Sequence, residues 1–480
     1  MRFAFLTACS EIAILEHGQN DILQRLRTSK QQKLSQLTHL MHSNTPITRL
    51  PNEILAFIFE CIPQDAITIS HVNRHWRQLA LRLPSLWRNI HLGPCNDQIV
   101  EYLNRSQPVS LTITLDVNDE DLRDDDCDFY GQEYRKTHGG VIACLSMLID
   151  HVSRWRSFHV NCASSEAMAT ILEYLGDLSA PYLTDVSLQM HNEDFDDPVP
   201  DWFIAIFNRG APLLRTMHLR GMALSNCQFP PTEIVELKLD VRENFFVFIL
   251  PKVFTYMPKL RALDIRGSFL WSEEDMRGDP VVLPVLERLT WGWLCIKPLL
   301  VSILTPTLQY LCLTKSVPDD VYLEPPDRLQ DLVDAITGSP YLPILPNLDE
   351  LRYDIELNYA ADCIFVGLPR VSLVQFSLEY NGHNGELYSN FFKTLMDDPL
   401  RWPHLTTIIF KSLPDQLFNP LRDLVLARSS EDHRFTICIE YTSITRYSAG
   451  GYHTYALSAE HMMWLRQHVN VEMVPGTWRA

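Results

Sequence analysis

His71 and His75 are four residues apart, the spacing that places two side chains on one face of a helix. Two such imidazoles could bind the same metal ion. However, no third ligand follows at a suitable spacing, and the eleven cysteines include no C-x-x-C pair. The histidines also lie beside Trp76, on a helix whose apolar side is needed for packing. We therefore interpret both as exposed side chains and expect the chain to use neither a metal nor another cofactor.

A second group of chemically capable residues is the carboxylate-rich run at 118–140, NDEDLRDDDCDFYGQEYRKTHGG. Carboxylates at alternating positions, with a glycine at the sixth, would form a calcium-binding loop. Both the alternating spacing and that glycine are missing here. The run is therefore interpreted as a solvated insertion.

Catalytic motifs are also missing. The sequence contains no glycine-rich phosphate loop, no G-x-S-x-G elbow and no H-E-x-x-H pair. We expect a protein that is not an enzyme, while an enzyme with a pocket at the rim of the folded chain remains an alternative. Histidines and carboxylates that are distant in sequence could still meet in such a pocket.

Charge and hydropathy restrict the partners. The net charge of −18 repels the phosphates of nucleic acids, and no basic patch compensates for it. No apolar run approaches the ~20 residues of a membrane-spanning helix. The apolar start of the chain, MRFAFLTA, is at the short limit for an export signal. Scattered cysteines are typical of reduced thiols, so we expect a protein of the cytoplasm or the nucleus that binds neither nucleic acid nor a membrane.

The polar residues that could bind a partner belong to a repeated pattern, Leu-x-x-Leu-x-Leu, usually preceded by proline. Eight clear copies occur, among them PYLTDVSLQ at 181, PKLRALDIR at 258 and PHLTTIIFK at 403. Weaker copies are RWRSFHVN at 154 and SLVQFSLE at 372, and PVSLTITLD at 108 and RFTICIEY at 434 are candidate terminal strands. The leading apolar residues are Leu183, Leu214, Ile234, Leu260, Leu286, Leu308, Leu348, Leu373 and Leu405. Their spacing of mostly about 20 to 32 residues is that of leucine-rich repeats.

The segments between copies, such as DWFIAIFNRGAP, FFVFILPKVFTYMP, KPLLVSILTP and ELYSNFFKTLMDD, suggest short helices ended by glycine or proline. Strand–helix units that repeat in this way stack into a curved solenoid whose strands form a parallel concave sheet. The residues between the leucines then line that sheet. As candidates for binding a protein substrate there, we select Gln189, His218, Arg220, Lys238, Asp240, Asp264, Arg266, Arg288 and Arg352.

A compact helical module precedes the repeats. In LPNEILAFIFECIP, residues 50–63, apolar side chains cover an arc of about 200° on a helix, twice the width that a surface helix needs. Pro63 ends this helix, and one or two short helices follow up to Pro84. The excess apolar surface predicts a partner as well as a core.

These patterns divide the chain into four segments: an amphipathic helix in 1–45, the helical module in 46–92, the repeat array in 93–442 and a capping segment in 443–480 that holds a closing helix. The fold class is α/β, with a small all-helical module followed by an irregular leucine-rich-repeat solenoid.

The module resembles an F-box, in a form close to that abundant in fungal proteins. The resemblance is carried by Leu50-Pro51-x-Glu53-Ile54-Leu55, Ile58-Phe59, Ser70-x-Val72-x-x-x-Trp76-Arg77-x-Leu79-Ala80 and Pro84-x-Leu86-Trp87. It departs from the family in the short link before Ile69 and in Asn73, where cysteine is usual. Leucine-rich repeats after an F-box are a known combination in this family.

The resemblance implies a substrate receptor of a Skp–cullin–F-box ubiquitin ligase. The F-box would bind the Skp adaptor, and through it a cullin, while the repeats would bind an unknown substrate protein. The residues that match the adaptor-facing positions of the family are Leu50, Pro51, Ile54, Leu55, Ile58, Val72 and Trp76. A Skp-bound scaffold without a ligase role is the main alternative.

Overall fold

The structure is a computed structural model of the 480-residue chain. It describes residues 51–92, 96–117, 138–163, 165–191, 204–222, 233–246, 254–270, 280–292, 303–313, 347–353, 370–376, 403–410, 415–428, 435–441 and 457–475, together with shorter stretches and single positions elsewhere. These residues form two compact units, one of residues 1–88 and 103–107 and one of residues 89–102 and 108–480. Each unit is described separately.

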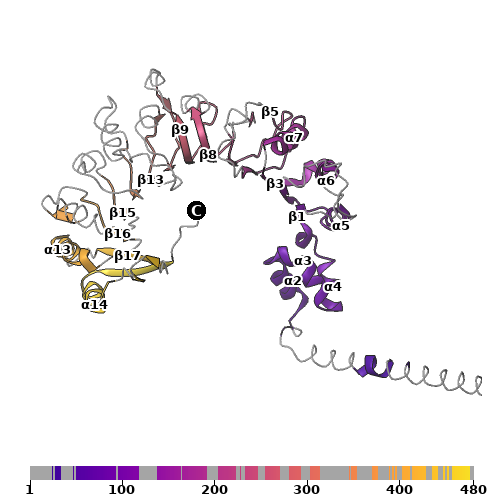
Figure 1. The fold of residues 1–480 in the computed structure, drawn as a ribbon, viewed down its shortest axis with the longest axis horizontal. Coiled ribbons are helices and arrows are strands. Elements are labelled where there is room, and N and C mark those ends of the chain that lie inside the picture. Colours follow the sequence, from indigo (N-terminus) through magenta and orange to yellow (C-terminus); the bar gives the residue numbers. More distant parts are fainter. Residues whose placement is uncertain are drawn as a thin grey trace, which may run out of the picture. The chain divides into compact units, whose positions relative to one another are not determined.

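The first unit is helical (Figure 1). It contains α2 (Asn52–Glu60), α3 (Ala66–Val72) and α4 (Arg74–Ala80), with single 3₁₀ turns at Pro63–Asp65 and Pro84–Trp87. Each 3₁₀ turn begins with proline, whose fixed φ suits the start of a helical turn and whose missing N–H needs no partner there. The predicted stop at Pro63 is therefore confirmed, and two helices follow it.

The core of this unit is small. Leu55 and Phe59 of α2, Ala66 and Ile69 of α3, Ala80 of α4, and Leu86 and Trp87 are all buried. The Phe59 ring packs on that of Trp76 with 4.9 Å between the ring centres. The buried Trp87 indole donates a hydrogen bond from Nε1 to the carbonyl oxygen of Ala80 at 2.9 Å. The ring contact thus joins α2 to α4, and the Trp87 hydrogen bond joins the second 3₁₀ turn to α4.

The amphipathic helix predicted in residues 1–45 lies mostly outside the described residues. Within it, residues 28–33 are helical, and all of them are exposed.

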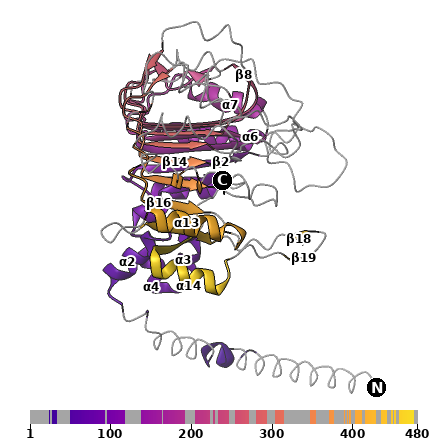
Figure 2. The same ribbon diagram turned by 90° about the vertical axis from the view of Figure 1, so that its left-hand side faces the viewer.

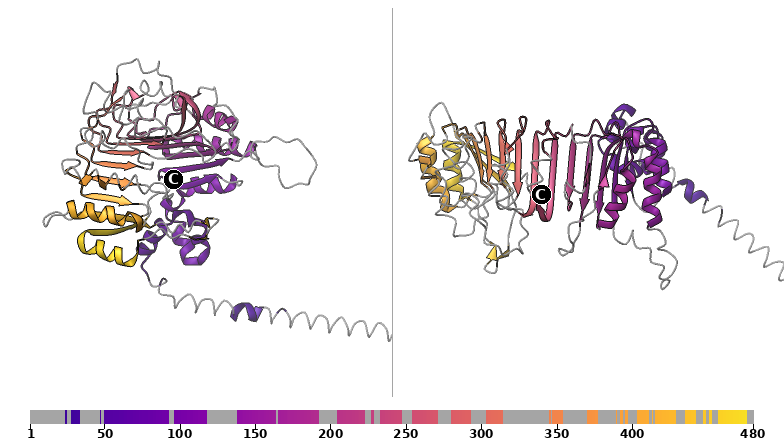
Figure 3. Two further views of the ribbon diagram at one scale, coloured as in Figure 1. Left: turned by 60° about the vertical axis from the view of Figure 1, so that its left-hand side comes forward. Right: turned by 90° about the horizontal axis from the view of Figure 1, so that it is seen from above.

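The second unit is built on a 14-stranded parallel sheet whose strands follow one another in chain order (Figures 1 and 3). Its strands are β1 (Asn89–Leu92), β2 (Leu111–Val117), β3 (Trp155–Cys162), β4 (Asp185–Met190), β6 (Thr216–Arg220), β8 (Glu236–Phe246), β9 (Ala262–Leu270), β11 (Arg288–Gly292), β13 (Tyr310–Leu313), β14 (Glu350–Tyr353), β15 (Leu373–Phe376), β16 (Thr407–Phe410), β17 (Thr436–Tyr441) and β20 (Asn470–Pro475). The predicted α/β class with a long parallel sheet is confirmed. The strand β1, which the sequence analysis included in the helical module, belongs to this sheet.

The repeated leucines form continuous rows in the core. The leading residues from Leu183 to Leu348, and Leu405 after them, are all buried. From β4 to β15, the carbonyl oxygen of the residue before the strand accepts hydrogen bonds from two successive N–H groups of the next repeat. Thr184 O accepts from Arg215 and Thr216 at 2.9 and 3.0 Å, and the pattern continues to Ser372 O, which accepts from Thr406 and Thr407. The same turn geometry therefore recurs across the array.

The position of Leu373 differs from the prediction. Leu373 pairs in register with Glu350 and Thr407, which are polar-face positions, and it is only half-buried. The leading residue of this repeat is Val371, which is fully buried. The prediction was wrong because the Leu-x-x-Leu-x-Leu pattern can be aligned here with either Val371 or Leu373 as its leading residue. The two alignments differ by two residues, so both preserve the alternation of the strand.

Helices lie at both ends of the array: α5 (Asn96–Arg105), α6 (His138–Ile149) and α7 (Ser165–Leu175) near its start, and α13 (Phe418–Arg428) and α14 (Ala459–His468) near its end (Figure 1). In DWFIAIFNRGAP the described residues instead include strand β5 (Ile204–Ala205), which pairs with β7 (Cys227–Gln228). In KPLLVSILTP they include β12 (Ile303–Leu304), which pairs with β10 (Val281–Val282).

The helix prediction was therefore wrong for the described parts of these two connections. Only 22 residues separate Leu286 from Leu308, which leaves little room for a helix after a strand and its turns. Neighbouring extended connections satisfy each other's backbone groups by pairing. In ELYSNFFKTLMDD the described positions are helical, as predicted.

The C-terminal segment contains the predicted closing helix, α14, and adds strand β20, which was not predicted. Figure 2 shows α13 and α14 lying together at this end of the sheet. Phe418 of α13 stacks on His461 of α14 with ring centres 3.8 Å apart. No helix among the described residues is long and apolar enough to cross a membrane. Cys61, Cys144, Cys162, Cys312 and Cys438 form no disulfide bond.

Candidate protein-binding surfaces

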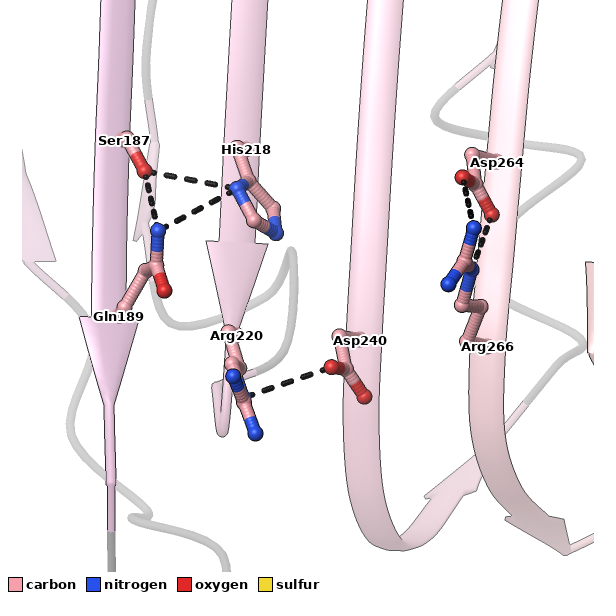
Figure 4. Close-up of polar contacts among 7 residues, drawn as sticks. All are labelled: Ser187, Gln189, His218, Arg220, Asp240, Asp264 and Arg266. Carbon is pink, nitrogen blue, oxygen red and sulfur yellow. Dashed lines mark hydrogen bonds and ion pairs between the residues drawn. The ribbon is translucent and has the colours of Figure 1, made fainter. Parts of the chain in front are cut away.

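The polar face of the sheet carries the selected side chains in aligned rows. The register places Ser187 of β4, His218 of β6, Lys238 of β8 and Asp264 of β9 in one row across adjacent strands. Gln189, Arg220, Asp240 and Arg266 form the next row. Side chains of alternate residues share one face of a strand, so these two rows lie on a single surface (Figure 4).

A neutral hydrogen-bonded group occupies the β4–β6 part of this face. Gln189 Nε2 donates to Ser187 Oγ at 3.0 Å, and both atoms lie 3.5 Å from His218 Nδ1 (Figure 4). Burial, with a further contribution from the charge of Lys238, lowers the pKa of His218 below its ordinary value. His218 is therefore uncharged at neutral pH and can take part in hydrogen bonds with neutral groups.

Serine beside histidine also occurs in hydrolytic enzymes, where the histidine activates the hydroxyl for attack. At 3.5 Å the Ser187–His218 contact is at the outer limit of a hydrogen bond, and Gln189 shares it. The contact uses Nδ1, and no carboxylate hydrogen-bonds the ring of His218 among the described residues. The arrangement is that of a polar surface.

Ion pairs occupy the strands that follow. Arg220 Nε lies 3.4 Å from Asp240 Oδ2, and Lys238 Nζ lies 3.4 Å from Glu236 Oε1. Arg266 binds Asp264 on its own strand through two hydrogen bonds of 3.0 and 3.1 Å. Oppositely charged side chains thus neutralise one another across β6, β8 and β9.

A stack of cations on an aromatic ring follows on β11, β13 and β14. The Arg288 guanidinium carbon lies 4.2 Å from the centre of the Tyr310 ring, and that of Arg352 lies 5.2 Å from it. Arg352 Nε also donates to Glu350 Oε1 at 2.6 Å. Tyr310 is buried, and this burial raises the pKa of its hydroxyl well above the ordinary value, so the side chain is neutral. The register accordingly brings together every selected residue from β4 to β14 on one face.

The second candidate surface is the outer side of α2. Phe57 is 65% exposed and Ile54 47% exposed, while Leu55 and Phe59 on the opposite side are buried. Ile58 is half-buried, and Cys61 is exposed beside Phe57 and Ile54. With 100° between successive residues, the apolar arc of α2 therefore divides into an inner half and an outer half. The outer half is a surface of a kind that marks a protein–protein contact.

Comparison with known families identifies this unit. Residues 47–93 match the F-box-like family. The chain therefore carries an F-box-like domain. No curated protein matches the chain. F-box domains generally bind the Skp adaptor, in agreement with the exposed apolar side of α2.

The residues predicted to contact the adaptor differ in their accessibility within the F-box-like domain. Pro51, Ile54 and Val72 are exposed, and Leu50, Ile58 and Trp76 are half-buried. Leu55 is fully buried, so it supports the core of the domain and is closed to a partner in this conformation. Val72 is the last residue of α3, and the chain is extended at Asn73.

Phe57 is the most exposed large apolar side chain of the described part of this domain, and the list of predicted contacts omits it. That list followed the positions that match the family. The signal was present in the apolar arc itself, because Phe57 lies on the same side of α2 as Ile54 and Cys61 when the helix is viewed along its axis.

His71 and His75 are exposed, as predicted, and no cluster of three potential metal ligands occurs among the described residues. The acidic run at 118–140 lies outside them up to residue 137.

Proposed function

We propose that the chain is a substrate receptor of a Skp–cullin–F-box ubiquitin ligase. The observation that carries this proposal is the apolar outer side of α2 on a unit that matches the F-box-like family. Covering an exposed phenylalanine such as Phe57 contributes roughly 1.5–3 kcal/mol before the cost of association. A partner helix is a suitable cover for such a surface, and the Skp adaptor is the partner that the family supplies.

We further propose that the array is of the leucine-rich-repeat type and binds the substrate protein on its polar face. Support comes from the recurring turn, the rows of buried leucines and the parallel order of the strands. A surface of this breadth with mixed charges suits another protein better than a small molecule. The repeats of the array differ in length, and some of their connections contain short extended segments, as at β5 and β12.

In this function the chain performs no chemistry itself. It joins substrate to ligase, which raises the effective concentration of substrate lysines near the ubiquitin-conjugating enzyme. Such a receptor works in the cytoplasm or the nucleus, and the surface of the array then determines which substrate is modified.

Co-purification of the full chain with a co-expressed Skp adaptor tests the proposed domain surface. We expect Ile54→Glu together with Phe57→Glu to abolish co-purification, because both charges would be buried against the adaptor. Leu426→Glu with Met463→Glu is the matched control, since these apolar residues of α13 and α14 are 57% and 59% exposed and lie outside the domain. Unchanged binding by the Ile54/Phe57 variant, with its circular dichroism spectrum also unchanged, would contradict the proposal.

Recruitment of a cullin distinguishes the proposed ligase receptor from the alternative, a Skp-bound scaffold. A ligase receptor must bring a cullin into the same complex, and the reconstituted complex must extend ubiquitin chains on a bound protein. A complex of chain and adaptor that excludes the cullin would favour the scaffold.

A further inference from the structure

Four of the five cations selected on the polar face have a carboxylate partner on that same face. Those cations are Arg220, Lys238, Arg266 and Arg352, and their closest carboxylate contacts range from 2.6 to 3.4 Å. Arg288 differs. Among the described residues no carboxylate forms an ion pair with it, and its side chain is exposed. The neighbouring Glu287 pairs with Arg261 at 3.8 Å instead.

The guanidinium of Arg288 is nonetheless held in place. It lies over the Tyr310 ring at 4.2 Å, in the geometry of a cation–π contact. A guanidinium stacked on a ring keeps its N–H groups available at the edges. On the other side, the register neighbour of Arg288 is Ala262 of β9, whose methyl group is too short to cover those edges. The N–H groups of the Arg288 guanidinium are therefore held in one orientation and face solvent.

The local charge around Tyr310 is positive. Two guanidinium groups, those of Arg288 and Arg352, lie within 5.2 Å of the centre of one ring, and Glu350 is the one carboxylate that pairs with either among the described residues. The chain as a whole carries a net charge of −18. A single positive position on a strongly acidic protein can attract one negative group while the surroundings repel a run of them.

We propose that Arg288, stacked on Tyr310, binds the carboxylate of a single aspartate or glutamate in the partner protein. This proposal deepens the proposed function, because it assumes that the polar face of the array binds the substrate. It assigns the substrate segment a monoanionic side chain at this position. A dianionic phosphate is disfavoured because Glu350 pairs in register with Tyr310 and would lie close to the second negative charge.

The proposal can be tested with synthetic peptide arrays probed by the full chain, purified both alone and after co-expression with the Skp adaptor. Each peptide of a diverse set is present in three forms that differ at one position, with glutamate, glutamine or phosphoserine. We expect the wild-type chain to bind a subset of the glutamate forms at least about tenfold more tightly than their glutamine forms, the size of a charge-assisted hydrogen bond. The Arg288→Gln variant should lose this preference.

Arg261→Gln is the matched control, since Arg261 is an exposed arginine that lies on the turn before β9 and pairs with Glu287. It should retain the wild-type preference. Absence of binding to any form, equal binding of glutamate and glutamine forms, tighter binding of phosphoserine forms, or a preference that survives Arg288→Gln would each overturn the proposal.

Adaptor binding in the same preparations separates this proposal from the proposed function. Arg288→Gln should leave adaptor binding intact, because it lies outside the F-box-like domain. If the chain preferred glutamate forms through Arg288 but bound no adaptor, the ligase role would fail and the carboxylate site would stand.

Discussion

The side chain of Asn73 accepts a hydrogen bond from the backbone N–H of Trp76 at 2.9 Å, and its own backbone is extended, with φ −159° and ψ 174°. This is the geometry of a helix N-cap, in which a side-chain oxygen replaces a missing backbone acceptor. Asn73 therefore ends α3 and begins α4. Asn73 is one of the positions at which this chain departs from the usual F-box pattern, which has cysteine here. The asparagine side chain supplies the capping oxygen at this position.

Replacement of Asn73 by alanine should loosen the start of α4. The lost cap costs about 1 kcal/mol, which corresponds to a roughly fivefold larger equilibrium constant for opening of the first turn. Hydrogen exchange of the amides of residues 74–80 in the full chain measures this change. Asn73→Asp keeps an acceptor oxygen and should exchange like the wild type, and equal exchange in all three chains would contradict the capping role.

The elements of the array show which features of the fold follow from sequence alone. The alternation of leucines predicted the strands and their polar face, because burial of one side fixes the register. The pattern failed at Leu373, where two phases of alternation compete, and in the connections at β5 and β12, whose described residues pair as short strands. It also missed β20, since NVEMVP has no leucine pattern.

The candidate surfaces were predictable to different degrees. The polar rows from β4 to β14 followed from the repeat, and three of the four paired cations bind a carboxylate two residues earlier on their own strand, which the sequence also shows. The pairing of Arg220 with Asp240 and the placement of Arg288 between Ala262 and Tyr310 required the register. On α2 the apolar arc was evident, whereas the division between buried Leu55 and exposed Phe57 required the packing of α4 against it.

The start of α14 depends on a carboxylate of the 3₁₀ turn Asp415–Leu417, which precedes α13. Asp415 Oδ1 accepts a hydrogen bond from the backbone N–H of Ser458 at 2.7 Å and lies 2.9 Å from His461 Nδ1. The hydrogen bond from Ser458, and then that from His461, lower the pKa of Asp415 below its ordinary value. A lowered pKa in the folded state means that the charged carboxylate stabilises the fold.

This contribution should be complete above the ordinary carboxyl pKa and should disappear as the pH falls through the lowered value. We expect Asp415→Asn to increase hydrogen exchange of the α14 amides relative to wild type at pH 7, and to increase it progressively less as the pH falls below ~4 toward the lowered pKa of the wild-type carboxyl. His461→Gln serves as the background control, because the Ser458 contact remains. A ratio between the two chains that is independent of pH would contradict this role.

At the scale of the whole array, each strand of the 14-stranded sheet pairs, among the described residues, with the sheet strands before and after it in the chain. In such an arrangement stability is close to a sum of repeat and interface contributions, and damage at one end spreads only to adjacent repeats. Because damage spreads only to adjacent repeats, a defect at one end of the array should leave the other end folded.

Leu465 of α14 is fully buried, and Leu465→Ala should cost about 2–5 kcal/mol locally. Hydrogen exchange should then rise in α13, β17 and β20, while the amides of β2, β3 and β4 keep their wild-type rates. Ile113→Ala in β2, which is equally buried, is the mirror control and should affect β1 and β3 but not β17. A uniform rise along the whole sheet in either variant would show instead that the array unfolds as one cooperative block, in which case substrate binding at β11–β14 would stabilise both ends together.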